Sequence, residues 1–129
     1  MERTLGIYIH IPFCASKCGY CDFYSLAGQE RRMPDYEQAL CAHIEESAGA
    51  LAPYVIDSVY FGGGTPSFFG AKRLCSVFNT LKRTARVRKN AEVTVEMNPD
   101  SVDLKSLRLL RREGVNRISL GAQSANDDI

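Results

Sequence analysis

The stretch "LGIYIHIPFCASKCGYC", residues 5–21, joins a strand pattern directly to three closely spaced cysteines. Its first seven residues are rich in β-branched and aromatic side chains, and Ile7, Ile9 and Ile11 recur at every second position. That alternation is typical of a strand with one apolar face. The cysteines follow at the spacing C-x3-C-x2-C. The stretch therefore predicts a strand whose carboxyl end leads into a thiol-rich loop.

Strand and helix patterns alternate along the rest of the chain. The expected strands cover residues 5–11, 56–61, 91–97 and 116–124 (the last with its exit loop), and the expected helices cover residues 34–51, 71–85 and 103–114. Pro34 stands near one helix start, Asp103 is the expected N-cap of another, and Gly114 is its expected stop. Such alternation implies parallel strands joined by right-handed crossovers. We therefore expect an α/β fold of about four parallel strands and three helices.

Each expected strand is aliphatic on one face and polar on the other, because side chains alternate along a strand. Tyr8 and His10 oppose the isoleucines of the first strand, and Thr94 and Glu96 oppose aliphatic residues of the third. We expect the aliphatic faces to meet the helices and the polar faces to line a concave interior that holds a polar ligand. A sheet with one solvent-exposed face would give the same pattern.

Composition places the chain among ordinary globular proteins. It has 129 residues, 45% of them hydrophobic and 24% charged, with a net charge of +1. This balance gives no sign of a nucleic acid or an anionic membrane as a partner. No apolar run approaches the roughly 18 residues of a membrane span, and the first residues show no secretory signal. Five cysteines, three of them in one loop, favour the reducing cytoplasm over a disulfide framework.

The three thiols of the loop favour metal binding. Thiolates bind zinc, copper(I) or the iron of an iron–sulfur cluster. Structural zinc usually takes four ligands in two pairs, and here His10 could serve as a fourth ligand. A cubane cluster matches better, because three thiolates can hold three irons and leave the fourth iron open to a substrate. Cys41 and Cys75 lie in expected helices and are interpreted as core cysteines.

Two further stretches place polar or flexible groups at strand ends. "GGGTP", residues 62–66, follows the second strand, and its glycines let the backbone approach a ligand closely, although a tight turn would also explain them. Glu96 ends the third strand on its polar face, at the rim where barrel active sites lie. A solvated or paired carboxylate is the alternative interpretation of Glu96.

The cysteine loop, with Tyr20 before its last cysteine, resembles the cluster motif of the radical S-adenosylmethionine (SAM) superfamily. Together "YIHIPFC", "GGGTP", "ExNP" and "RxSxGxQS" resemble the oxygen-independent coproporphyrinogen III oxidase family within it. The resemblance runs over residues 5–124. It implies an incomplete (βα)6 barrel, so we expect residues 1–129 to be the N-terminal part of a radical SAM core, truncated after its fourth strand.

The resemblance also implies roles for individual residues. Cys14, Cys18 and Cys21 would hold a 4Fe–4S cluster whose open iron takes the amino and carboxylate groups of SAM. The residues implied as SAM contacts are Tyr8, Tyr20, Gly63, Gly64, Thr65, Glu96 and Gln123. It assigns no residue a catalytic role.

One position separates two functions within the resemblance. The oxidases carry a fourth cysteine two positions after the third, where this chain has Phe23. "CDF", residues 21–23, is instead similar to the heme chaperone branch, HemW. We therefore expect a heme chaperone with heme or porphyrin and a heme-acceptor protein as partners. The alternatives are oxidation of coproporphyrinogen III in porphyrin biosynthesis and, from another class, a structural zinc module.

Overall fold

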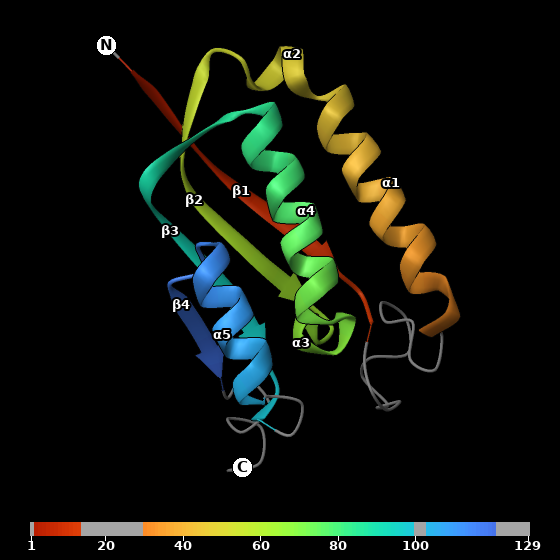
Figure 1. Cartoon of the computed structure of the whole chain (residues 1–129). Helices are drawn as coiled ribbons and strands as arrows, with labels where there is room; N and C mark the ends of the chain where they lie inside the picture. Colours follow the sequence, from red (N-terminus) through yellow and green to blue (C-terminus); the bar gives the residue numbers. More distant parts are fainter. Residues whose placement is uncertain (1, 14–29, 100–102, 121–129) are drawn as a thin grey trace, which may run out of the picture.

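The computed structural model describes residues 2–13, 30–99 and 103–120, which form a parallel sheet with helices on one face (Figure 1). The strands are β1 (Arg3–Ile11), β2 (Tyr54–Gly63), β3 (Arg86–Met97) and β4 (Arg117–Leu120), in that spatial order and all parallel. The helices are η2 (Glu30–Arg32), α1 (Met33–Glu46), α2 (Ala48–Leu51), α3 (Pro66–Phe69), α4 (Ala71–Thr84) and α5 (Leu104–Glu113). The expected α/β class with four parallel strands is confirmed.

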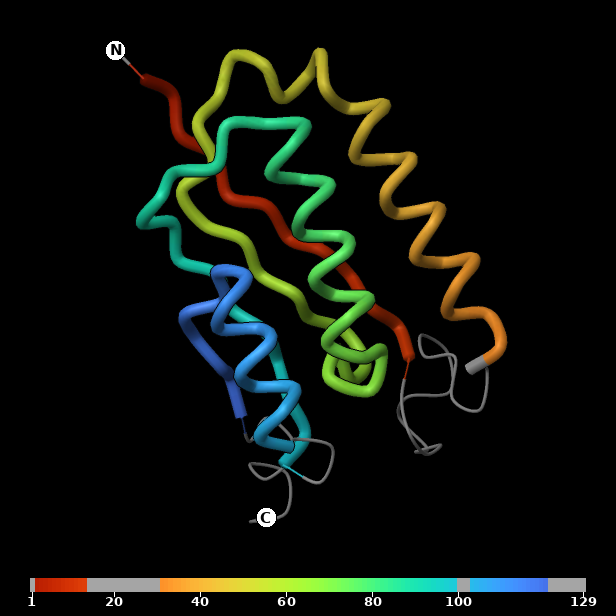
Figure 2. The backbone as a smooth tube through the Cα atoms, viewed as in Figure 1, coloured from red at the N-terminus to blue at the C-terminus, as the bar shows by residue number. Residues whose placement is uncertain are grey.

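The helices α1, α4 and α5, one from each connection between successive strands, lie over the same face of the sheet, as the chain trace in Figure 2 shows. Helix α1 belongs to the β1–β2 connection, α4 to the β2–β3 connection and α5 to the β3–β4 connection. Helix α4 packs between α1 and α5. None of the described helices has the length and apolar content that crossing a membrane requires.

The helices differ from expectation in two places. The single helix expected over residues 34–51 is split into α1 and α2 at Ser47, whose hydroxyl donates to the carbonyl oxygen of His43 at 2.8 Å. A serine that bonds back to the preceding turn bends a helix. The four-residue helix α3 was not expected, because one turn is too short to show a periodic pattern. Asp103 and Gly114 cap α5 as expected, and Gly114 has a φ of 120°.

Strand β3 begins five residues before its expected start, and β4 is short. The added residues 86–90 read "RVRKN", a basic run without strand alternation, yet Val87 pairs with Ile56 on β2. The pairing then jumps to Ser58 and Glu92, so the extra β3 residues bulge. Asn116, expected in the fourth strand, instead precedes β4. Its side-chain oxygen accepts a hydrogen bond from the Val93 N–H of β3 at 2.9 Å.

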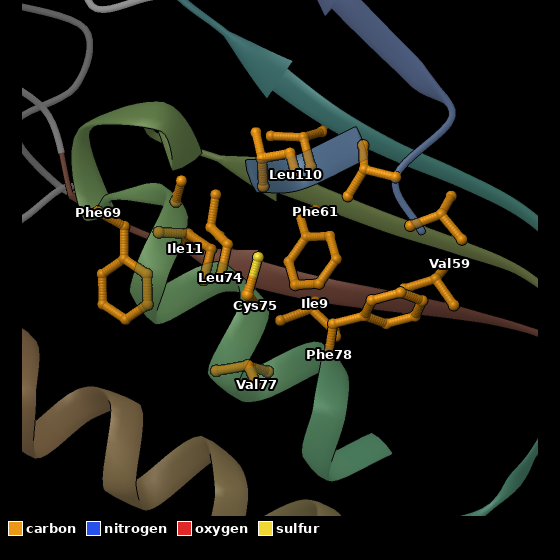
Figure 3. Close-up of a cluster of buried hydrophobic side chains, with 14 of the residues drawn as sticks. Ile9, Ile11, Val59, Phe61, Phe69, Leu74, Cys75, Val77, Phe78 and Leu110 are labelled. Carbon is orange, nitrogen blue, oxygen red and sulfur yellow. The ribbon is translucent and has the colours of Figure 1, made fainter. Parts of the chain in front are cut away.

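The aliphatic faces of the strands and one stripe of α4 make the core (Figure 3). Leu74, Phe78 and Leu81 of α4 are buried as expected, and Phe78 meets Phe61 of β2 edge-to-face with ring centroids 6.4 Å apart. Cys75 lies in this core, which confirms its interpretation. Cys41 is half-buried on α1 and accepts a bond from the Thr80 hydroxyl at 3.3 Å.

The opposite face of the sheet is open within the described residues. Tyr8 of β1 is 59% exposed there, although Thr94 of β3 is buried. The aliphatic side chains of β4, Ile118 and Leu120, are 37% and 56% exposed. The expectation that one face of each strand meets helices therefore holds for β1, β2 and β3, and β4 is only partly covered.

Candidate functional site

The predicted site residues that the structure describes gather at the carboxyl ends of β1, β2 and β3. Tyr8 pairs with Tyr60 across β1 and β2, and Tyr60 pairs with Thr94 of β3. Glu96 lies two residues further along β3, on the same polar face. Parallel strands bring their carboxyl ends to one edge, where ligands of such folds bind.

Both carboxylate oxygens of Glu96 are bonded. The hydroxyl of Tyr60 donates to Oε2 at 2.7 Å, and the backbone N–H of Gly63 donates to Oε1 at 3.2 Å. Hydrogen bonds to an ionised acceptor are stronger than neutral ones. The carboxylate is therefore held between β2 and β3 rather than turning freely in solvent.

Two tyrosine rings lie beside this carboxylate. The rings of Tyr8 and Tyr60 are stacked, with centroids 5.8 Å apart and planes 16° from parallel. Burial, and then the negative charge of Glu96, raise the pKa of Tyr8 above its ordinary value. The bond to Glu96, followed by burial, raises the pKa of Tyr60, while Ser119 acts in the opposite direction. Both phenols therefore stay neutral hydrogen-bond donors at pH 7.

The glycine loop after β2 is tied to the end of β1. Gly63 has a φ of 121°, and a Cβ there would lie 2.7 Å from the backbone oxygen of Ile11. Left-handed backbone of this kind favours glycine. The N–H of Gly64 donates to the same Ile11 oxygen at 2.8 Å, and the N–H of Thr65 donates to the oxygen of Phe13 at 2.7 Å. The loop is thus positioned directly beside the residue that precedes Cys14.

Phe13 anchors the end of this β1 segment. Its side chain is 0% exposed; it stacks on Phe69 of α3 with centroids 5.7 Å apart and meets Tyr36 of α1 edge-on at 5.4 Å. The Tyr36 hydroxyl donates to the carbonyl oxygen of His10 at 2.6 Å. Sequence reasoning did not single out Phe13, Tyr36 or Tyr60; Phe13 and Tyr60 are aromatic residues in or beside the motifs, which was the available signal, and Tyr36 carried none. The chain thus enters the cysteine loop from a fixed point.

The remaining predicted site residues, Cys14, Cys18, Tyr20, Cys21 and Gln123, lie outside the described residues, as does Phe23. In the ranges that the structure does describe, no group of three or more His, Cys, Asp or Glu side chains forms a possible metal site. The structure therefore brings together Tyr8, the 63–65 loop and Glu96, and the proposed cluster ligands remain a prediction from the sequence.

The protein is a parallel α/β protein with a glycine loop and a fixed carboxylate at the carboxyl edge of its sheet, where such folds bind ligands, and a thiol-rich segment follows β1 in the sequence. The family model described as the Radical SAM superfamily matches residues 8–129. The chain belongs to the radical SAM superfamily. Proteins of this superfamily generally carry a 4Fe–4S cluster and SAM.

Curated relatives fall in two groups. Heme chaperone HemW of Buchnera aphidicola subsp. Schizaphis graminum is 34% identical over 127 residues, 97% of this chain and 34% of the relative. HemW of Mycobacterium tuberculosis is 39% identical over 125 residues, 95% of this chain and 32% of the relative. The oxygen-independent coproporphyrinogen III oxidase of Escherichia coli is 31% identical over 129 residues, 99% of this chain and 28% of the relative.

A solved structure confirms the expected fold. Coproporphyrinogen III oxidase (HemN) from Escherichia coli, a radical SAM enzyme, matches with a TM-score of 0.84 and 31% identity. The match covers 92% of this chain and 28% of that chain. The chain spans about a third of the length of the curated relatives. Both groups are thus homologues of this protein, as the motifs indicated.

Proposed function

We propose that this protein is a radical SAM heme chaperone that binds a 4Fe–4S cluster and SAM. The cluster ligands would be Cys14, Cys18 and Cys21. The observation that carries the chaperone over the oxidase is Phe23, which stands where the oxidases have a further cysteine. We also propose that the 129 residues are the N-terminal part of a radical SAM core in a cytoplasmic protein.

The described residues suit SAM as a ligand. The Gly63 N–H donates to Oε1 of Glu96, which brings the glycine loop beside the carboxylate, and Glu96 offers that carboxylate to hydroxyl or ammonium donors at the same edge. The ring of Tyr8, 59% exposed, offers a flat surface to an adenine. Gly64, Thr65, Tyr20 and Gln123 would complete the set of contacts. When bound, the cluster and SAM supply radical chemistry, while these residues bind and orient.

Phe23 favours flat, hydrophobic heme over the tetracarboxylate substrate of the oxidase. A phenylalanine can be neither a thiol donor nor a ligand, and it offers apolar surface suited to the flat, hydrophobic heme. A coproporphyrinogen site needs several basic groups for its carboxylates. The cysteine loop contains only Lys17, and Arg31 and Arg32 follow it on η2. An apolar residue and few basic residues in and after the loop therefore support heme binding.

The chaperone proposal is tested with the full-length protein under anaerobic conditions. We expect heme to bind and coproporphyrinogen III to remain unconverted in the presence of SAM and a reductant, with tetrapyrroles separated by chromatography. We expect Phe23→Cys to create no such activity, because recognition of the carboxylates would still be missing. Multiple-turnover formation of protoporphyrinogen IX by the natural protein would restore the oxidase alternative. Stoichiometric zinc without iron in anaerobically purified protein would instead support the zinc module.

The SAM site is tested by replacing Glu96. We expect Glu96→Ala to weaken SAM binding by about 1–3 kcal/mol, the cost of leaving polar partners unpaired. Glu92→Ala is the matched control, since Glu92 lies on the same face of β3 and makes only a 3.5 Å ion pair with Arg117, both side chains 58% exposed. Such exposed pairs contribute little. Calorimetry of both cluster-loaded variants measures the difference in SAM affinity. Equal SAM affinities of the two variants would contradict the assignment of Glu96 to the SAM site.

A further inference from the structure

We infer that Tyr60 is a positioning residue of the SAM site, which holds the Glu96 carboxylate and the Tyr8 ring in one arrangement. The inference rests on the proposed SAM site, and neither the motifs nor the comparisons single out Tyr60. Three observations carry it: a short bond, a ring stack, and the place of Tyr60 in the sheet.

The bond fixes the carboxylate. Tyr60 donates to Oε2 of Glu96 at 2.7 Å, shorter than the 3.2 Å bond from the Gly63 N–H to Oε1. One donor would leave the carboxylate free to rotate about that contact, whereas two donors on different oxygens define its plane. Glu96 is half-buried, so part of its surface remains available to a ligand. Tyr60 therefore sets the direction in which the carboxylate meets that ligand.

The stack fixes the neighbouring ring. Tyr8 and Tyr60 are register partners on adjacent strands, and their rings lie 16° from parallel. A Cβ at Gly62 would lie 2.7 Å from the Tyr8 hydroxyl oxygen and 2.9 Å from Cε1 of Tyr60. The absence of a side chain at Gly62 thus lets both rings lean toward the carboxyl edge of the sheet. One residue, Tyr60, contacts both Tyr8 and Glu96.

A purely structural role does not account for this geometry. The core lies on the other face of the sheet, where Val59 and Phe61 point toward the helices (Figure 3). Tyr60 lies on the open face and is only half-buried. Removal of its hydroxyl leaves no hole in the core. What the hydroxyl orders is the carboxylate of Glu96.

Two variants and their combination test the inference in the full-length, cluster-loaded protein. Tyr60→Phe keeps the ring and removes the donor, and we expect SAM to bind roughly 10- to 150-fold more weakly, as for the loss of one hydrogen bond to a charged group. Because Tyr60 acts through Glu96, Tyr60→Phe should cause no further loss in a Glu96→Ala background. Tyr54→Phe, at the other end of β2, is the control and should match the natural protein.

A titration gives a readout that a structural role would not move. The bond to Glu96 is the first cause of the raised pKa of Tyr60, so Glu96→Gln should lower that pKa toward the ordinary value. The ultraviolet absorbance of tyrosinate, compared with a Tyr60→Phe background, follows this change without SAM. An unchanged titration would show that the bond does not form in solution and would overturn the inference.

The outcomes separate this inference from the proposed function. If the natural protein does not bind SAM at all, the proposed function fails. If Glu96→Ala weakens binding but Tyr60→Phe does not, only the role of Tyr60 fails. Additive losses in the double variant would mean that Tyr60 acts independently of Glu96, and would also overturn the inference.

Discussion

Replacement of any one of Cys14, Cys18 and Cys21 by alanine is expected to abolish the 4Fe–4S cluster. Each thiolate would bind a separate iron, and the loop offers no spare thiol to replace it. Anaerobic reconstitution of the full-length protein should give about four irons and four sulfides per chain, whereas each of the three variants should retain almost none. Iron and sulfide analysis measures the loss directly.

Cys41 and Cys75 provide matched controls for these variants. Cys75 is buried between α4 and the sheet, and Cys41 is half-buried on α1 with the Thr80 hydroxyl as a partner. Their replacement by alanine removes packing and should lower the thermal stability slightly while cluster content stays intact. Loss of iron from the Cys41 or Cys75 variants, with iron kept in a loop variant, would contradict the ligand assignment.

The layered fold could be predicted because alternation and helical periodicity report burial. Ile9 and Ile11 are buried and Tyr8 is exposed, as the alternation along β1 required. The early start of β3 could not be predicted, since its residues 86–90 are basic and mostly exposed and join the sheet through backbone pairing. Pairing of this kind depends on the partner strand, which a local pattern does not contain.

The strand face on which the described site residues lie could be predicted from the sequence, but the contacts between them could not. Alternation placed Tyr8 and Glu96 on the polar face, and both lie there. The bond between Tyr60 and Glu96 joins residues 36 positions apart and depends on the relative register of β2 and β3. The anchor of Phe13 between α1 and α3 likewise depends on how helices pack over the end of β1. Such contacts become visible only when the strands are aligned in space.

Gly63→Ala is expected to have the largest effect among glycine replacements in the described part of the chain. The φ of 121° is strained for any side chain, at about 1–3 kcal/mol. In addition, the new Cβ would lie 2.7 Å from the backbone oxygen of Ile11 and 2.8 Å from the His10 ring. The Ile11 oxygen also receives the Gly64 N–H, so it cannot move without loosening the loop. We expect the free energy of unfolding to fall by roughly 2–4 kcal/mol, from strain and overpacking together.

Two other glycines separate the strain from the collision. Gly70 has a φ of 103°, but the atom nearest to an added Cβ is the end of the flexible Arg73 side chain at 3.6 Å, so Gly70→Ala measures backbone strain alone. Gly49, in α2, has nothing within 4 Å, and Gly49→Ala should be neutral or stabilising by up to about 1 kcal/mol. Urea unfolding should therefore rank the losses Gly63 above Gly70 above Gly49. If Gly63→Ala cost no more than Gly70→Ala, the end of β1 would yield to the new side chain. The backbone contact between the glycine loop and the segment before Cys14 would then be too flexible to position the cysteine loop.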